Sequence, residues 1–279
     1  MAWQLTHDVD TFRDTAGEFL RSRPIEYTVP LTLLDKLRTR GLHFYGPDDP
    51  IFGWWCGPDG AVGGAFLQTP PHMVFVAGES GVPELVALLA DHPLPGVNGT
   101  AEVAAEFADA WCARTGGTAQ IRQSNRLFRL AALIPPDPSP PGAARTADPA
   151  DRPLLVDWFG EFLVEIGEGH LREPDGGVDA WLEYGGMTLW EVDGTPVAMA
   201  GRNQAAAGVA RVGPVYTPKA HRARGYGGAA TAAVTRAALD SDATDVVLYT
   251  DLANPTSNAL YPRLGYRPVE DRVVWEFAA

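Results

Sequence analysis

A basic, glycine-containing turn between a predicted strand and a strong helix former constrains this chain more than any other feature. Residues 211–216 are rich in β-forming side chains, and Pro218 ends that strand because proline has no backbone N–H for a sheet ladder. Four basic residues and three glycines follow within residues 219–228, and residues 228–239 are rich in alanine, the strongest helix former. We therefore expect a strand, a basic turn, a glycine loop and a helix in direct succession.

This glycine loop has the physical properties of an anion-binding site. The first N–H groups of a helix have no partners within the helix, and the helix dipole adds partial positive charge there. Glycine lets a phosphate approach the backbone closely because no Cβ stands in the way, and Arg222 and Arg224 can add charge-assisted hydrogen bonds. Taken alone, the same turn is equally compatible with an ordinary helix start and a solvated basic surface.

A second motif lies near the C-terminal end of the sequence. Residues 245–251 are typical of a buried strand, and Asn254 is followed by a proline, a residue favoured in the first turn of a helix. Asn258 and Tyr261 are three positions apart, so they share one face of that helix. Gly265 closes the helix, and a final strand is expected at residues 273–277.

Together the two motifs resemble those of the GNAT superfamily of N-acetyltransferases. The spacing Arg222-x-x-Gly225-x-Gly227 is similar to the pyrophosphate-binding signature of that family. The strand end with its Asn, the Asn-Ala pair, the Tyr and the Gly-Tyr pair are similar to the closing motif of the family. A dinucleotide-binding fingerprint requires a different glycine spacing, and a nucleotide triphosphate loop requires a Gly-Lys-Ser/Thr ending, which this sequence lacks here.

The resemblance implies that the co-substrate is acetyl-CoA and that its binding residues lie in these motifs. The strand backbone at Val215, Tyr216 and Thr217 would lie along the pantetheine arm, and the N–H of Val215 would polarise the thioester carbonyl as an oxyanion hole does. Asn254 and Asn258 would form hydrogen bonds near the point where two strands separate, or near the cofactor. The pyrophosphate would be held by Arg222, Arg224, Gly225, Tyr226, Gly227 and Gly228.

The resemblance further implies direct transfer of the acetyl group to a primary amine in a ternary complex. Tyr261 is the candidate general acid for the departing thiolate, because a phenol titrates near ~10 and a thiol near ~8.5, so little pKa tuning is needed. The alternative for Tyr261 is an aromatic that fills the interface between helix and sheet. The general base stays open among Glu165, Glu168, His170, Glu191 and water.

The first half of the sequence has a similar order of elements but lacks the basic loop. Helices are expected at residues 9–22 and 31–40, followed by alternating strands and helices. The turn at residues 77–82 has glycines but no arginines, and Glu79 would repel a phosphate. We expect residues 1–134 to form a degenerate GNAT-like domain that no longer binds CoA, with an unrelated α/β domain as the alternative.

A proline-rich octet separates the two halves. Residues 135–142 contain five prolines, which favour an extended spacer. Residues 143–279 would then form the catalytic GNAT domain. The expected fold class is α/β (α+β), with two GNAT-like domains, each a mixed, mostly antiparallel twisted sheet flanked by helices.

Composition narrows the classes of partner. A net charge of −13 argues against general nucleic-acid binding, which requires a basic face. The sequence has no apolar run that would span a bilayer and no signal-peptide pattern at its start, so we expect a cytoplasmic protein that does not bind membranes. The two cysteines and six histidines lack metal-ligand spacing, so no metal is expected.

The expected partners are therefore acetyl-CoA and an unidentified amine acceptor, and the chain is expected to be a monomer or a homodimer. The alternative function is a non-catalytic sensor or scaffold protein that binds an acyl-CoA.

Overall fold

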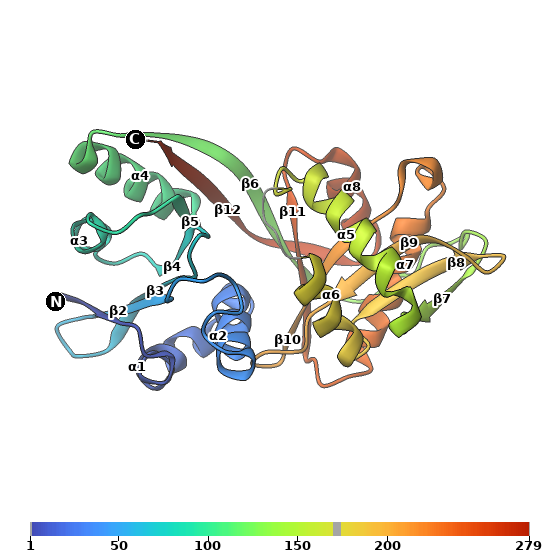
Figure 1. Cartoon of the computed structure of the whole chain (residues 1–279), viewed down its shortest axis with the longest axis horizontal. Helices are drawn as coiled ribbons and strands as arrows, with labels where there is room; N and C mark the ends of the chain where they lie inside the picture. Colours follow the sequence, from blue (N-terminus) through green and yellow to red (C-terminus); the bar gives the residue numbers. More distant parts are fainter. Residues whose placement is uncertain (1, 170–173, 279) are drawn as a thin grey trace. The chain divides into compact units, whose positions relative to one another are not determined.

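The computed structural model describes residues 2–169 and 174–278, which form two compact units (Figure 1). Unit 1 consists of Met1–Leu127, Thr250–Asn254 and Val269–Ala279, and unit 2 consists of Phe128–Tyr249 and Pro255–Pro268. Unit 1 therefore includes two segments from the C-terminal end of the sequence. The proline-rich octet belongs to unit 2. The domain boundaries predicted at residues 134 and 143 remain predictions.

Unit 1 is a mixed, mostly antiparallel sheet with four helices among its described residues. The strand order is β1-β2-β3-β4-β5-β12-β6, and β4 and β5 are a parallel pair. The helices are α1 (Val9–Ser22), α2 (Thr28–Arg40), α3 (Val82–Leu89) and α4 (Ala101–Thr115). The strands are β1 (Ala2–Thr6), β2 (Ile51–Cys56), β3 (Val62–Gln68), β4 (Val74–Gly78), β5 (Gly96–Thr100), β6 (Thr118–Leu130) and β12 (Tyr266–Ala278).

The predicted helix at residues 9–22 is confirmed, and its start has a local cause. Asp8 precedes α1, and its side chain accepts a hydrogen bond of 2.7 Å from the backbone N–H of Thr11. Inside unit 1, Leu85, Phe107 and Val97 bury completely in a core shared by α3, α4 and the sheet. Strand β1 was not predicted from the sequence.

In unit 2 the strand order is β7-β8-β9-β10-β11, with the end of β6 beside β11. Only the β10–β11 pair is parallel among the pairs for which registers are described. The helices are the 3₁₀ turn η1 (Pro149–Asp151), α5 (Arg152–Glu165), α6 (Pro174–Glu183), the 3₁₀ turn η2 (Lys219–His221), α7 (Tyr226–Leu239) and α8 (Pro255–Arg263). The strands are β7 (Ala143–Thr146), β8 (Met187–Val192), β9 (Thr195–Arg202), β10 (Val209–Tyr216) and β11 (Asp245–Asp251).

Two hydrophobic clusters cover the two faces of this sheet. Helices α5 and α6 lie on one face and α7 on the other (Figure 1). On one face, the buried alanines of α7 and Tyr261 of α8 pack against strand residues that include Val212 and Leu248. On the other face, α5 and α6 pack against Met199 and Tyr216, among others. The strands are therefore apolar on both faces, and the site must open at an end of the strands rather than on a sheet face.

Local signals explain several boundaries in unit 2. The sequence predicts a helix cap at Asp148, with Asp151 at the third helical position, and the structure confirms it as a capping box: the Asp148 side chain accepts from Ala150 N–H and the Asp151 side chain accepts from Asp148 N–H. The Asp193-Gly194 pair in the sequence predicts a hairpin of residues 187–192 and 195–202, and the β8–β9 pair confirms it. Asp193 and Gly194 have φ values of 50° and 75°, as a type I′ turn requires. The glycine-rich, charged composition of residues 166–177 predicts a loop, which is wrong at its end because α6 already begins at Pro174. Residues 170–173 of this prediction lie outside the described residues.

Candidate active site in unit 2

The central feature of unit 2 is that strands β10 and β11 separate. They pair in parallel from Val209 to Val212 on β10 and from Asp245 to Leu248 on β11. Strand β10 continues to Tyr216, yet within the described residues it forms no further pairs with β11. The end of β10 therefore faces an opening on its β11 side, where backbone groups are available to a ligand.

A β-bulge at the same position reverses the face of the sheet to which the side chains at the end of β10 point. The register with β9 shifts by one residue between the pairs Val212–Arg202 and Val215–Ala200. In a regular strand, Val212 and Tyr216 would lie on the same face because they are an even number of positions apart. The extra residue places Val212 in the α7 layer and Tyr216 in the α5 layer instead. The bulge therefore brings the Tyr216 side chain to the face that α5 covers.

The glycine loop leads from β10 directly into α7, as predicted. Gly225 is the N-cap residue with φ of 83°, a left-handed conformation that glycine adopts without strain. The first intrahelical bond runs from Ala229 N–H to Gly225 C=O, so the N–H groups of Tyr226, Gly227 and Gly228 precede the regular helical pattern. The Tyr226 side chain is buried in the core, so this residue can offer a ligand only its backbone.

Arg222 ties the loop to its surroundings. Its Nε donates to the carbonyl oxygen of Thr217 at 2.8 Å, and its Nη2 donates to both carboxylate oxygens of Glu165 at 2.6 and 2.7 Å. Its guanidinium carbon lies 5.8 Å from the centre of the Tyr216 ring. Arg222 therefore already has an anionic partner on α5, whereas Arg224 is exposed.

The closing motif supplies a buried tyrosine. Tyr261 on α8 is 6% exposed, its ring lies 6.2 Å from that of Phe128, and its hydroxyl is hydrogen-bonded to the Ser257 side chain. Burial raises the pKa of Tyr261, and the bond to Ser257 partly opposes this. Asn258 is half-buried on the same helix. Asn254 lies one residue before α8, in the segment that belongs to unit 1, and its N–H donates to the carbonyl oxygen of Asp251.

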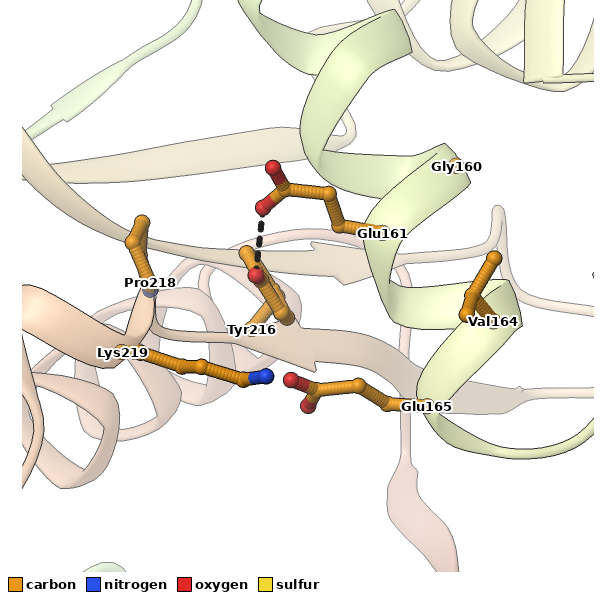
Figure 2. A pocket seen from close by; sticks show the side chains of 7 residues that line it. All are labelled: Gly160, Glu161, Val164, Glu165, Tyr216, Pro218 and Lys219. Carbon is orange, nitrogen blue, oxygen red and sulfur yellow. Dashed lines mark hydrogen bonds between the residues drawn. The ribbon is translucent and has the colours of Figure 1, made fainter.

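A pocket of about 570 Å³ lies between α5 and the end of β10. Figure 2 shows the Tyr216 hydroxyl donating to Glu161 at 2.5 Å, while the Lys219 side chain points toward Glu165. Burial and then the bond to the Glu161 carboxylate raise the pKa of Tyr216 to about 12. The remaining residues that line the pocket are Gly160, Val164 and Pro218.

Comparison with known proteins identifies this half of the chain. Residues 153–266, which span α5 to the start of β12, match the model of the family described as acetyltransferase (GNAT) family. The chain contains a GNAT acetyltransferase domain. No curated protein sequence is similar enough to this one to count as a match.

Solved structures extend the likeness of fold to the whole chain. A Drosophila protein is 17% identical over 99% of this chain and 98% of its own, with a TM-score of 0.69. A GCN5-related N-acetyltransferase from Sphaerobacter thermophilus is 16% identical over 98% and 94%, with a TM-score of 0.59. A tandem GNAT protein from the clavulanic acid biosynthesis pathway is 13% identical over 99% and 98%, with a TM-score of 0.53. The predicted α/β class with GNAT-like sheets is thereby confirmed at the level of fold.

The candidate bases of the GNAT domain fall in different places. Glu165 lines the pocket, whereas Glu191 accepts a hydrogen bond of 2.7 Å from Arg145 on β7 and does not line it. Glu168 follows α5 and is also absent from the lining, and His170 lies outside the described residues. Sequence reasoning missed Glu161, although it lies four residues before Glu165 on a predicted helix and so shares its face.

In unit 1, the loop before α3, which has the same place in the strand–loop–helix order as the glycine loop before α7, is covered by tryptophan. Gly81 is the N-cap residue of α3, and the indole N–H of Trp3 donates to its carbonyl oxygen at 2.7 Å. A Cβ at Gly81 would lie 2.8 Å from ring carbons of Trp55. The two indoles therefore occupy the space in front of this helix start.

The parallel strand pair of unit 1 is also closed by a side chain. The described pairs of β4 and β5 are Val74–Val97 and Phe75–Asn98. Arg272 is 2% exposed, and its guanidinium donates to Val76 O at 3.0 Å and to Asn98 Oδ1 at 3.1 Å. It thereby joins β4 to β5 at the point where their pairing ends.

Among the helices that the structure describes, none combines the length and the apolar character needed to cross a membrane. No group of three or more His, Cys, Asp or Glu side chains within residues 2–169 and 174–278 is arranged to hold a metal ion.

Proposed function

We propose that the GNAT domain is an acetyl-CoA-dependent N-acetyltransferase that moves the acetyl group to a primary amine by direct attack in a ternary complex. The observation that carries this proposal is the separation of β10 from β11, which opens beside the N-terminus of α7. A strand edge with available backbone groups suits the amides of a pantetheine arm. A glycine-lined helix start suits a pyrophosphate.

In this proposal, the cofactor follows the chain from strand to loop. The backbone of Val215, Tyr216 and Thr217 holds the pantetheine arm, and the Val215 N–H polarises the thioester carbonyl. Asn254 and Asn258 support the cofactor or the strand ends. The pyrophosphate is held by Arg222, Arg224, Gly225, Tyr226, Gly227 and Gly228.

The chemistry needs two proton transfers. The amine nitrogen attacks the carbonyl carbon, a tetrahedral intermediate forms, and the C–S bond breaks to release a thiolate. Tyr261 donates a proton to that thiolate, and its raised pKa keeps the hydroxyl protonated at neutral pH, as a general acid requires. The amine loses its proton to a carboxylate of the pocket or to water.

We propose one cofactor site per chain. In unit 1, Trp3 and Trp55 cover the loop before α3, and Arg272 joins the two strands that would have to separate. These contacts support the prediction that the first domain is a degenerate copy.

Calorimetry with acetyl-CoA tests this function without knowledge of the acceptor. We expect one site per chain, with weaker binding in Arg222→Ala. Free thiol release is then measured with a panel of small primary amines, and Tyr261→Phe is compared with the wild type. Absence of acetyl-CoA binding refutes the proposal, and two sites refute the degenerate first copy.

A second candidate is a non-catalytic acyl-CoA-binding sensor or scaffold. It is favoured by the burial of Tyr261, which is 6% exposed and packs as a core aromatic. Tight acetyl-CoA binding without acetyl transfer to any amine of the panel would support this candidate over the enzyme.

A further inference from the structure

Arg222 connects the proposed cofactor loop to the pocket on the α5 side. Its Nη2 donates to both oxygens of Glu165, which lines the pocket, while its Nε donates to Thr217 in the turn after β10. The same guanidinium belongs to the loop that we assign to pyrophosphate. One side chain therefore lies between the two substrate sites.

This ion pair is of the kind that breaks easily. The side chains of Arg222 and Glu165 are 42% and 35% exposed, and ion pairs with this much access to water are weak. A pyrophosphate carries more negative charge than one carboxylate and matches the guanidinium fork equally well. Arg222 is therefore expected to leave Glu165 when the cofactor arrives.

The pocket changes character when Arg222 leaves. The charged residues that line the pocket are Glu161, Glu165 and Lys219. Without Arg222, two carboxylates are therefore balanced by one ammonium group. The ammonium group of Lys219 points toward Glu165 from within the pocket (Figure 2). The Lys219 side chain is exposed, so an ammonium group of a ligand can replace it.

We propose that Glu165 exchanges partners during the reaction, holding Arg222 in the empty protein and the cationic group of the acceptor once the cofactor pyrophosphate has taken Arg222. The acceptor class is an amine with a second positive charge, because the reacting nitrogen must be neutral when it attacks. Binding of acetyl-CoA therefore strengthens binding of the acceptor, and the reverse holds equally. This inference rests on the proposed function.

The alternative is that the Arg222–Glu165 contact has a purely structural role. If the Arg222–Glu165 pair stays intact and only positions the loop, loss of the Glu165 charge should loosen the loop and weaken cofactor binding. The exchange predicts stronger binding, because Arg222 no longer has to give up a partner. The sign of the change therefore separates the two roles.

The cofactor side is tested by calorimetry with CoA, which cannot donate an acetyl group. We expect Glu165→Gln to lower the Kd for CoA by about twofold to fivefold, the range expected for loss of an exposed competing ion pair. Asp157→Asn removes an exposed charge from the same helix away from the pocket, and should change the Kd by less than Glu165→Gln does. In an Arg222→Ala background, Glu165→Gln should have no further effect.

The acceptor side is tested with 1,4-diaminobutane as the probe. We expect saturating CoA to tighten the binding of this diamine to the wild type, and Glu165→Gln to abolish that coupling. Butylamine, which lacks the second charge, should show much weaker coupling.

The outcomes separate this inference from the proposed function. Wild-type protein that does not bind CoA refutes both. CoA binding that Glu165→Gln weakens, or that Arg222→Ala leaves unchanged, overturns the exchange and leaves the cofactor site standing. Diamine binding that CoA does not strengthen overturns the assignment of the acceptor class.

Discussion

Replacement of Gly227 by alanine should make the protein at least as stable while weakening its hold on the cofactor. Gly227 is the second residue of α7, and glycine in a helix costs about 0.8–1.0 kcal/mol relative to alanine. A Cβ there would lie 3.0 Å from Thr217 Oγ1, the end of a small side chain that can rotate away. We therefore expect the free energy of unfolding to rise by roughly 0–1 kcal/mol.

The effect on the cofactor should have the opposite sign. The new methyl group lies in the first turn of α7, whose backbone N–H groups we assign to the pyrophosphate, and it removes the close approach that glycine allows. A hydrogen bond to a charged group contributes about 1.5–3 kcal/mol, so the loss of one such bond weakens binding about tenfold or more. Denaturant unfolding and calorimetry with CoA, on the same preparation, measure the two effects.

Gly228→Ala provides a matched control for packing. A Cβ at Gly228 would lie 3.0 Å from Leu260 Cδ1 in the buried contact between α7 and α8, so we expect a loss of about 1–3 kcal/mol of stability. A Gly227→Ala protein that is less stable than the wild type but binds CoA equally well would refute the reasoning. Gly227 would then be present for packing and not for the ligand.

Three further predictions concern catalysis, backbone conformation and pH. Tyr261→Phe should lower kcat by about 100-fold or more with little change in KM. The control is Tyr266→Phe, which removes a hydroxyl that bonds to Thr235 and should leave kcat near the wild-type value. Equal rates in the wild type and both variants would exclude the acid role of Tyr261. Gly265→Ala should cost more than about 3 kcal/mol of stability or prevent folding, because Gly265 has a φ of 97° and the new Cβ would lie 1.7 Å from the carbonyl oxygen of Ala132. A melting temperature equal to that of the wild type would contradict this prediction. A hydrogen bond from Arg145 holds the pKa of Asp151 below the usual aspartate value of 3.8, so the stabilising effect of this carboxylate is present above pH 3.8 and is lost as the pH falls below that value. Asp151→Asn should therefore cost about 1–2 kcal/mol at neutral pH, and thermal unfolding across pH should show this cost shrinking in acid; a constant cost would contradict the linkage.

The sequence predicted those elements whose cause is local. The Asp148 cap and the turn at Asp193-Gly194 depend on a few neighbouring residues, and both were found correctly. Strand β1 was missed because its five residues are only partly buried and depend on pairing with β2. The start of α6 at Pro174 was missed because a glycine-rich, charged segment is typical of a loop.

The same division holds for the site. The order of strand, glycine loop and helix was predictable because glycine and proline act locally. The bulge that brings Tyr216 to Glu161 was not, because one extra residue in β10 is defined only by its pairing with β9. The partner of Arg222 was likewise hidden, since Glu165 lies 57 residues earlier in the sequence.

The division of the chain has a consequence for its synthesis on the ribosome. N-terminal domains usually fold first as a chain emerges. Here, unit 1 contains Val269–Ala279, and this segment supplies the part of β12 that pairs with β5. It also brings Arg272 to its position between β4 and β5. The N-terminal half must therefore remain incomplete, with one edge of β5 uncovered, until residues 272–276 have left the exit tunnel. A nascent chain arrested at residue 134 would present that edge to chaperones or to other chains.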